Sequence, residues 1–104
     1  MVALNYKNNK EIKKDVKALF LSAFPKDERP PAHYFFSSAL KDTNNIYAFY
    51  ENNLFIGFVQ LTTYKDICYV FFLAVSKEIR NQGRGSKILS WVKEFHKDKV
   101  ILLC

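Results

Sequence analysis

The last third of the chain contains the pattern that most restricts the fold. An apolar segment, Ile67–Val75, is followed by a polar loop, an amphipathic segment from about Gly85 to His96, and the compact apolar run Val100–Leu103. The amphipathic segment repeats its apolar residues at helical spacing, at Ile88, Leu89, Val92 and Phe95. A strand, a helix and a second strand of these lengths predict a β-α-β crossover with two parallel strands.

The middle of the chain has the pattern of antiparallel strands. Ile46–Tyr50 and Leu54–Thr63 are rich in β-branched and aromatic residues and flank the turn signal Asn52-Asn53. A second short turn at Lys65-Asp66 leads into the crossover. In the longer strand we expect one face to carry Leu54, Ile56 and Phe58, and the other Phe55, Val59 and Leu61. Both faces are apolar, so this strand is expected to be covered on both sides.

The first forty residues predict a short edge strand and two helices. Val2–Tyr6 alternates as a strand does, and Ile12 to Ala23 repeats apolar residues at helical spacing. Asn8 or Asn9 can cap this helix by accepting its first amides, and Pro25 ends it. A second helix is expected from Ala32 to about Leu40. The fold class is therefore α/β, a single domain over residues 1–104 whose mixed sheet has an antiparallel meander followed by a parallel β-α-β crossover.

Composition excludes several classes of protein. The chain is 49% hydrophobic and 25% charged, as globular domains are, and its formal charge is +6. No aromatic-interleaved basic stripe or helix-turn-helix signature accompanies that charge, so nucleic-acid binding is disfavoured. No apolar run approaches the roughly 18 residues of a membrane span. Lacking a secretory pattern at its start, the chain is expected to be cytoplasmic, with Cys68 and Cys104 as reduced structural thiols.

The loop before the last helix predicts an anion site. It reads Ser76 to Ser86, with Gly83 and Gly85 allowing tight turns and close approach of a ligand. A helix N-terminus favours phosphate, and Arg80 and Arg84 can add charge-assisted hydrogen bonds. A purely structural turn would use two glycines equally well. The spacing fits neither the dinucleotide fingerprint nor the P-loop.

The same segment resembles the GNAT N-acetyltransferase superfamily. The family pattern is Arg or Gln, two residues, Gly, one residue, and Gly or Ala, after a strand ending in Leu-Ala-Val. Arg80, Gly83 and Gly85 match it, and Leu73-Ala74-Val75 end the preceding strand. The upstream meander agrees as well, so the resemblance extends over the whole chain.

The resemblance implies that acetyl-coenzyme A is the co-substrate, with no metal. The cofactor would lie where Ile67–Val75 and Val100–Leu103 diverge, its pantetheine arm bonded to the main chain of Leu73 and Val75 as if it were another strand. Main-chain amides from Gln82 to Ser86 would hold the pyrophosphate. The candidate cofactor-binding residues are Leu73, Ala74, Val75, Arg80, Asn81, Gln82, Gly83, Arg84, Gly85 and Ser86.

No catalytic residue can be assigned. The family's acid, often a tyrosine, lies on a helix after the strand that ends at Cys104, in a C-terminal portion that this sequence lacks. None of the tyrosines matches that position: Tyr6, Tyr34, Tyr47, Tyr50, Tyr64 or Tyr69. Four other titratable residues are given no catalytic role: Glu28 and Glu51 are expected to be loop and strand-end carboxylates, and His33 and His96 helix-end residues.

Two functions therefore remain open. One is an acetyl-coenzyme A-dependent N-acetyltransferase acting on a primary amine, whether a small amine, a peptide or an antibiotic. The other is a non-catalytic coenzyme A-binding or interaction module with the same fold. Val100–Leu103 would expose an apolar strand edge. We therefore expect either a longer natural protein or a homodimer that completes the sheet there.

Overall fold

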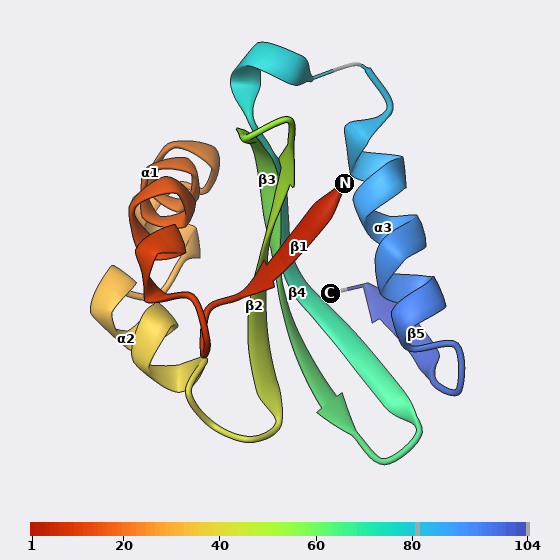
Figure 1. The fold of residues 1–104 in the computed structure, drawn as a ribbon. Helices are drawn as coiled ribbons and strands as arrows, with labels where there is room; N and C mark the ends of the chain where they lie inside the picture. The colour runs from red at the N-terminus through yellow and green to blue at the C-terminus, as the bar shows by residue number, and fades with distance from the viewer. Residues whose placement is uncertain (81, 104) are drawn as a thin grey trace.

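A computed structural model describes residues 1–80 and 82–103. The described residues form one five-stranded sheet in the order β1-β2-β3-β4-β5 (Figure 1). Neighbouring strands are antiparallel except β4 and β5, which are parallel. The predicted mixed α/β sheet is therefore confirmed. The strands are β1 (Val2–Asn5), β2 (Asn44–Glu51), β3 (Leu54–Tyr64), β4 (Ile67–Val75) and β5 (Val100–Leu103).

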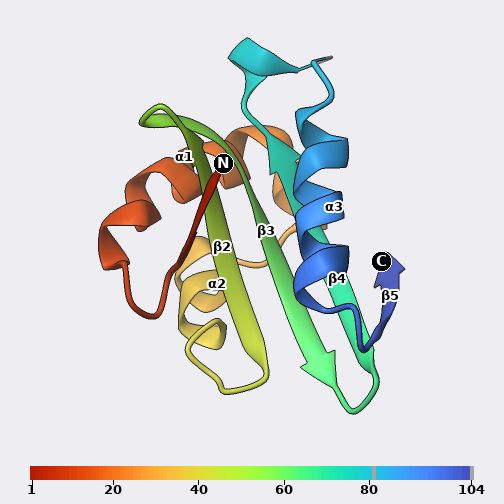
Figure 2. The ribbon, with the colours of Figure 1, turned by 45° about the vertical axis from the view of Figure 1, so that its right-hand side comes forward.

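The helices lie on both faces of the sheet. Helices α1 (Lys13–Ala23) and α2 (Ala32–Ser38) cover one face, and α3 (Arg84–Phe95) covers the other (Figure 2). Three short 3-10 turns connect these elements: η1 (Lys10–Ile12), η2 (Lys26–Glu28) and η3 (Lys77–Ile79). No helix among the described residues combines the length and apolar character needed to cross a membrane.

Each face of the sheet has its own core. Under α1 and α2 the core is aromatic: Phe20 is fully buried and stacks on Phe35 with ring centroids 4.1 Å apart. Under α3 the core is mainly aliphatic, with Ile88 and Val92 of the helix packed against β3 and β4. Because β3 contributes to both cores, its predicted coverage on both sides is confirmed.

The predicted faces of β3 are wrong in detail, because the strand contains a β-bulge. Phe49 pairs with Gly57 while the next residue of β2, Tyr50, pairs with Phe55, so Ile56 is an extra residue. A bulge shifts the alternation by one residue. Ile56 consequently joins Val59 and Leu61 under α3, whereas Phe55 and Phe58 pack under α1 and α2; Leu54 is exposed.

Gly57 follows the bulge and allows the backbones to approach closely. A Cβ atom built on Gly57 would lie 2.4 Å from the carbonyl oxygen of Ala74 and 3.0 Å from Cδ1 of Ile88. Any side chain there would collide with the β4 backbone. The glycine thus lets α3 pack tightly over β3 and β4, which places the start of α3 beside the end of β4.

The predicted asparagine cap of the first helix is also wrong. The helical segment does begin directly after Asn9, as the 3-10 turn η1, but no side-chain cap bond is formed. Asn9 instead donates from Nδ2 to the carbonyl oxygen of Asn5, at 3.0 Å. The side-chain amide of Asn9 therefore links the start of the helical segment to β1, and it accepts no hydrogen bond from the first backbone amides of the helix.

The parallel pairing of β4 and β5 is short. Ile67–Val70 pairs with Val100–Leu103, and the rest of β4 extends beyond it. Val100, Leu102 and Leu103 are exposed, and within the described residues β5 has no second neighbouring strand. Completion of the sheet by a second copy stays a prediction. Cys68, inside β4, is a buried free thiol whose pKa is raised by burial, and Cys104 lies outside the described residues.

Candidate functional site

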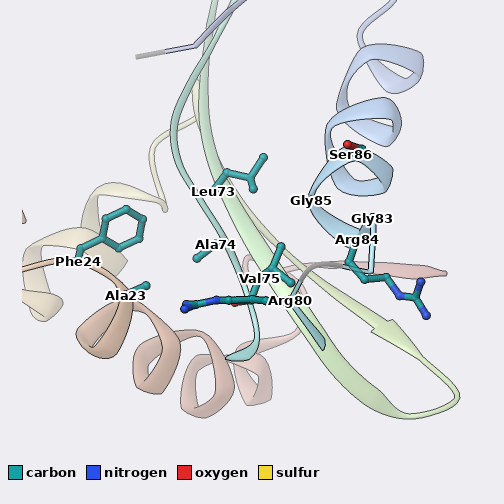
Figure 3. A pocket seen from close by; sticks show the side chains of 10 residues that line it. All are labelled: Ala23, Phe24, Leu73, Ala74, Val75, Arg80, Gly83, Arg84, Gly85 and Ser86. Carbon is teal, nitrogen blue, oxygen red and sulfur yellow. The ribbon is translucent and has the colours of Figure 1, made fainter. Parts of the chain in front are cut away.

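A pocket of about 470 Å³ lies between the end of α1, the end of β4 and the start of α3 (Figure 3). We call it the α3 pocket. Its lining residues are Ala23, Phe24, Leu73, Ala74, Val75, Arg80, Gly83, Arg84, Gly85 and Ser86. Most of the residues predicted to bind a cofactor are thus brought together around one space. Gln82 is not among the lining residues, and Asn81 falls outside the described residues.

The end of β4 offers backbone groups to this pocket. On one side, Leu73, Ala74 and Val75 pair with β3. On the other side they lie beyond the pairing with β5, so no strand of the described residues occupies that edge. Just before this edge β4 contains a second bulge. Gln60 pairs with Phe72 and Leu61 with Val70, so Phe71 is an extra residue. A free strand edge next to a pocket can bind an extended ligand by main-chain hydrogen bonds.

The start of α3 provides the second wall. Gly83 precedes the helix with φ 75° and ψ 10°, a left-handed conformation that glycine adopts without strain. The helix then begins at Arg84, one residue before the predicted start, and no side chain of the described residues caps it. The first amides of a helix have no intrahelical acceptors, and the helix dipole places positive potential there. This end of the pocket is accordingly suited to an anion.

Arg80 extends across the pocket. Its Nε atom donates to the carbonyl oxygen of Val75, at 3.1 Å, and its side chain points toward Ala23 (Figure 3). Among the described residues it forms no salt bridge. The hydrogen bond fixes the side chain while most of its guanidinium donors remain available, so Arg80 can contact an anion in the pocket.

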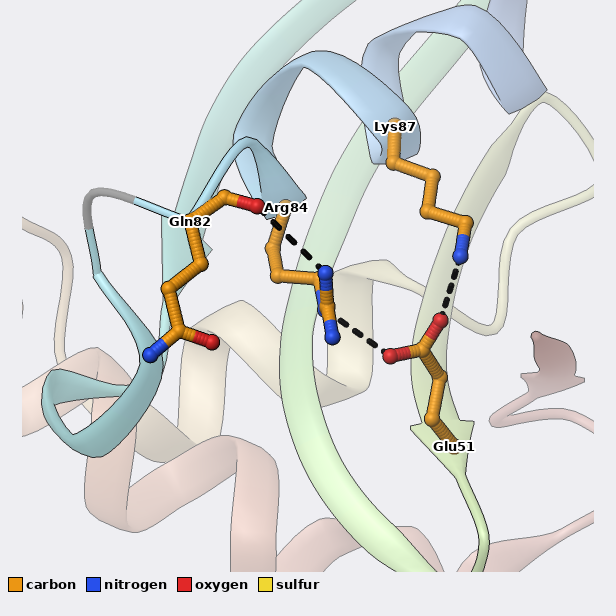
Figure 4. A network of polar contacts seen from close by, with 4 residues as sticks. All are labelled: Glu51, Gln82, Arg84 and Lys87. Carbon is orange, nitrogen blue, oxygen red and sulfur yellow. Dashed lines mark hydrogen bonds and ion pairs between the residues drawn. The ribbon is translucent and has the colours of Figure 1, made fainter.

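Arg84 lines the α3 pocket, but its guanidinium is directed elsewhere. Its guanidinium points away from the pocket, and its Nε atom lies 2.8 Å from Oε1 of Glu51, at the end of β2 (Figures 3 and 4). Lys87 donates to the other carboxylate oxygen of Glu51, at 2.5 Å. The hydrogen bond from Lys87, with the positive charge of Arg84 nearby, lowers the pKa of Glu51. Arg84 would therefore have to change its side-chain conformation before it could contact a phosphate in the pocket.

The candidate acids and bases lie away from the α3 pocket. Glu28 and His33 are exposed on η2 and α2. His96 is buried at the end of α3, where its Nδ1 atom lies 3.0 Å from the carbonyl oxygen of Val92, as expected for a helix-end residue. Among the described residues, arginines are the only titratable side chains lining the pocket. Nor do the described residues include a cluster of three or more potential metal ligands.

For three residues of this region the sequence predicts no role in the site. Ala23 and Phe24 close the pocket from the end of α1, which depends on packing that no local pattern encodes. Glu51 contacts residues more than thirty positions later in the chain. In the sequence, only its negative charge indicates that its partner would be basic.

Comparison with known proteins agrees with this geometry. The sequence model of the Acetyltransferase (GNAT) family matches residues 12–104. A search of curated proteins finds no match. A structure from Bacteroides thetaiotaomicron assigned to the GNAT family has a TM-score of 0.82 and 22% identity. That similarity covers 99% of this chain and 59% of the other.

Two further structures have the same fold at low identity. Tetrahymena GCN5 gives a TM-score of 0.79 at 21% identity, covering 99% of this chain and 69% of that one. An aminoglycoside 6'-N-acetyltransferase complexed with coenzyme A gives 0.76 at 14% identity, covering 93% and 56%. The present chain thus spans only part of the length of these proteins.

Proposed function

The chain belongs to the GNAT acetyltransferase family, and on that premise we propose that the α3 pocket binds acetyl-coenzyme A for transfer of its acetyl group to a primary amine. The observation that carries the proposal is the juxtaposition of a free β4 edge with an uncapped helix N-terminus in one pocket. The first suits the amide-rich pantetheine arm, and the second suits the pyrophosphate.

Charge in the pocket favours a phosphorylated ligand. Arg80 provides guanidinium donors at the wall opposite α3, and no carboxylate is among the described lining residues. The aminoglycoside 6'-N-acetyltransferase of similar fold is complexed with coenzyme A, which supports the same ligand here.

Binding is tested by calorimetric titration with coenzyme A, acetyl-coenzyme A and pantetheine, which has the arm but lacks the pyrophosphate. We expect saturable binding of both coenzyme A forms with a Kd of about 1 μM to 1 mM, comparable to the usual KM values of enzyme substrates. Pantetheine should bind at least about tenfold more weakly, since it forfeits the charge-assisted contacts. Equal affinities would contradict the role of the helix N-terminus.

Acetyl transfer places a further demand on the site. The amine must lose a proton and attack the thioester carbonyl, after which the C–S bond breaks and the thiolate takes a proton. The described lining of the α3 pocket contains no carboxylate, tyrosine, histidine or cysteine for these steps. This observation favours a second candidate function, a coenzyme A-binding module without catalysis.

Turnover distinguishes the two candidates. Release of coenzyme A thiol from acetyl-coenzyme A is followed with a panel of small amines, lysine peptides and aminoglycosides. Amine-dependent release above the solution rate supports the transferase. Binding without any amine-dependent release supports the non-catalytic module.

A further inference from the structure

Glu51 sits where it can influence anion binding without lining the α3 pocket. Glu51 is the last residue of β2 and so lies far in the sequence from the loop that precedes α3. Its side chain is only 18% exposed. One carboxylate oxygen contacts Arg84 and the other contacts Lys87, both in the first turn of α3 (Figure 4). One anion thus binds two cations next to a helix N-terminus that is itself suited to an anion.

The Arg84 contact is ionic but poorly aligned. Although Nε lies 2.8 Å from Oε1 of Glu51, it is buried and has no hydrogen-bond partner among the described residues. The other contact of the guanidinium is a long one, 3.4 Å from an Nη atom to the carbonyl oxygen of Gln82. A buried N–H without an acceptor is unfavourable. Arg84 therefore has unused donors that a phosphate could accept from.

We propose that Glu51 is an internal competitor of the bound ligand, a positioning residue that keeps Arg84 and Lys87 away from the ligand's phosphates. The inference rests on the proposed function of the α3 pocket. In the unaltered chain, the pyrophosphate is held by main-chain amides and Arg80, while Glu51 neutralises the cations of α3. The affinity for the ligand is therefore lower than it would be if Arg84 and Lys87 also contacted the phosphates.

The test is the sign of the change in affinity. Calorimetric titration with coenzyme A compares the unaltered chain with Glu51→Gln, Arg84→Gln and the double variant. The charge-assisted hydrogen bonds that a released Arg84 can make to a diphosphate should tighten binding about fivefold, and less at 0.5 M salt than at 0.05 M because of screening. In the double variant most of that gain should disappear, since Arg84 is no longer there to turn toward the ligand.

Glu94→Gln is the matched control. It makes the same change of net charge at the far end of α3, on a side chain that is 82% exposed, and should leave affinity within about twofold because solvent and salt screen it. Thermal melts check that Glu51→Gln remains folded.

Each outcome decides between the alternatives. If Glu51 instead holds the binding site in shape, Glu51→Gln should bind coenzyme A more weakly. Weaker binding or an unchanged affinity in this variant overturns the inference and leaves the proposed function intact. Retention of the full gain in the double variant overturns it too, because Arg84 would not be the released cation. Failure of the unaltered chain to bind coenzyme A overturns the proposed function and this inference with it.

Discussion

The two faces of the sheet depend on different kinds of interaction. Under α1 and α2, phenylalanine rings pack against one another, and Phe20 alone lies within ring-contact distance of four others. At the start of α3, the α3 pocket depends on backbone geometry at Gly57 and Gly83. Side-chain volume should therefore govern stability on the first face, and backbone conformation should govern ligand binding on the second.

The largest effect is expected from Phe20→Ala. Phe20 is fully buried and stacks on Phe35, so removing its ring leaves a cavity that costs about 3–5 kcal/mol of unfolding free energy. Urea denaturation measures the change. The variant that remains folded should still bind coenzyme A with nearly unchanged affinity. A loss below about 1 kcal/mol would mean that this aromatic core does not hold the fold together.

Gly57→Ala is expected to affect both stability and binding. Its new Cβ would lie 2.4 Å from the Ala74 carbonyl oxygen, which is backbone and cannot turn aside. Overpacking of this kind costs about 1–3 kcal/mol. The shift it forces in β4 should also weaken coenzyme A binding, because Ala74 lines the α3 pocket.

Gly85→Ala provides the matched comparison for Gly57→Ala. A Cβ at Gly85 would make an ordinary contact, 3.6 Å from Cγ2 of Val75, and alanine is favoured over glycine in a helix by up to about 1 kcal/mol. Stability should be unchanged or slightly higher, and coenzyme A affinity should be nearly unchanged, because the family pattern accepts Ala at this position. If Gly85→Ala destabilises as much as Gly57→Ala, close backbone approach is not what distinguishes the two positions.

The smallest expected effect concerns Tyr50 of β2. Its hydroxyl donates to Asp15 of α1 at 2.9 Å, and burial, followed by the Asp15 contact, raises its pKa well above the ordinary 10.0. The unfolded chain therefore releases this proton first as the pH rises. Stability from Tyr50 is fully present below pH 10 and falls progressively at higher pH.

Tyr50→Phe checks that dependence. At pH 7 the variant should lose about 0.5 kcal/mol, the low end for a hydrogen bond, because the contact is exposed. Between about pH 10 and 11, where the unfolded tyrosine ionises, its unfolding free energy should fall less steeply than that of the unaltered chain. Parallel slopes would rule out a raised pKa at Tyr50.

Elements set by local pattern were predictable from the sequence. The bounds of β4 and β5 match the predicted Ile67–Val75 and Val100–Leu103. The hairpin turn at Asn52-Asn53 is also as expected, since both residues adopt positive φ. The glycine spacing likewise indicated the pocket wall at Gly83, because left-handed backbone before a helix favours glycine.

What could not be predicted depends on contacts between distant segments. The bulge at Ile56 reverses the expected faces of β3, and a single strand's alternation contains no sign of it. Contact of Arg84 with the phosphates stays a prediction, but its ion pair with Glu51, from another strand, could not be inferred from the loop alone. A lone glycine inside a strand, such as Gly57, is the one local sign of such close backbone approach.

The central claim, that backbone geometry at the start of α3 binds the ligand, is tested most directly by titrating coenzyme A into Gly83→Val. The position has open space around it but needs φ near 75°, which a β-branched residue resists. Ser90→Val, on the exposed surface of the same helix, is the control. We predict that Gly83→Val retains the circular dichroism of the folded chain and loses coenzyme A binding, whereas Ser90→Val keeps it. Affinity within about twofold of the unaltered chain in Gly83→Val, well under the roughly 1.4 kcal/mol of a tenfold loss, would contradict the account.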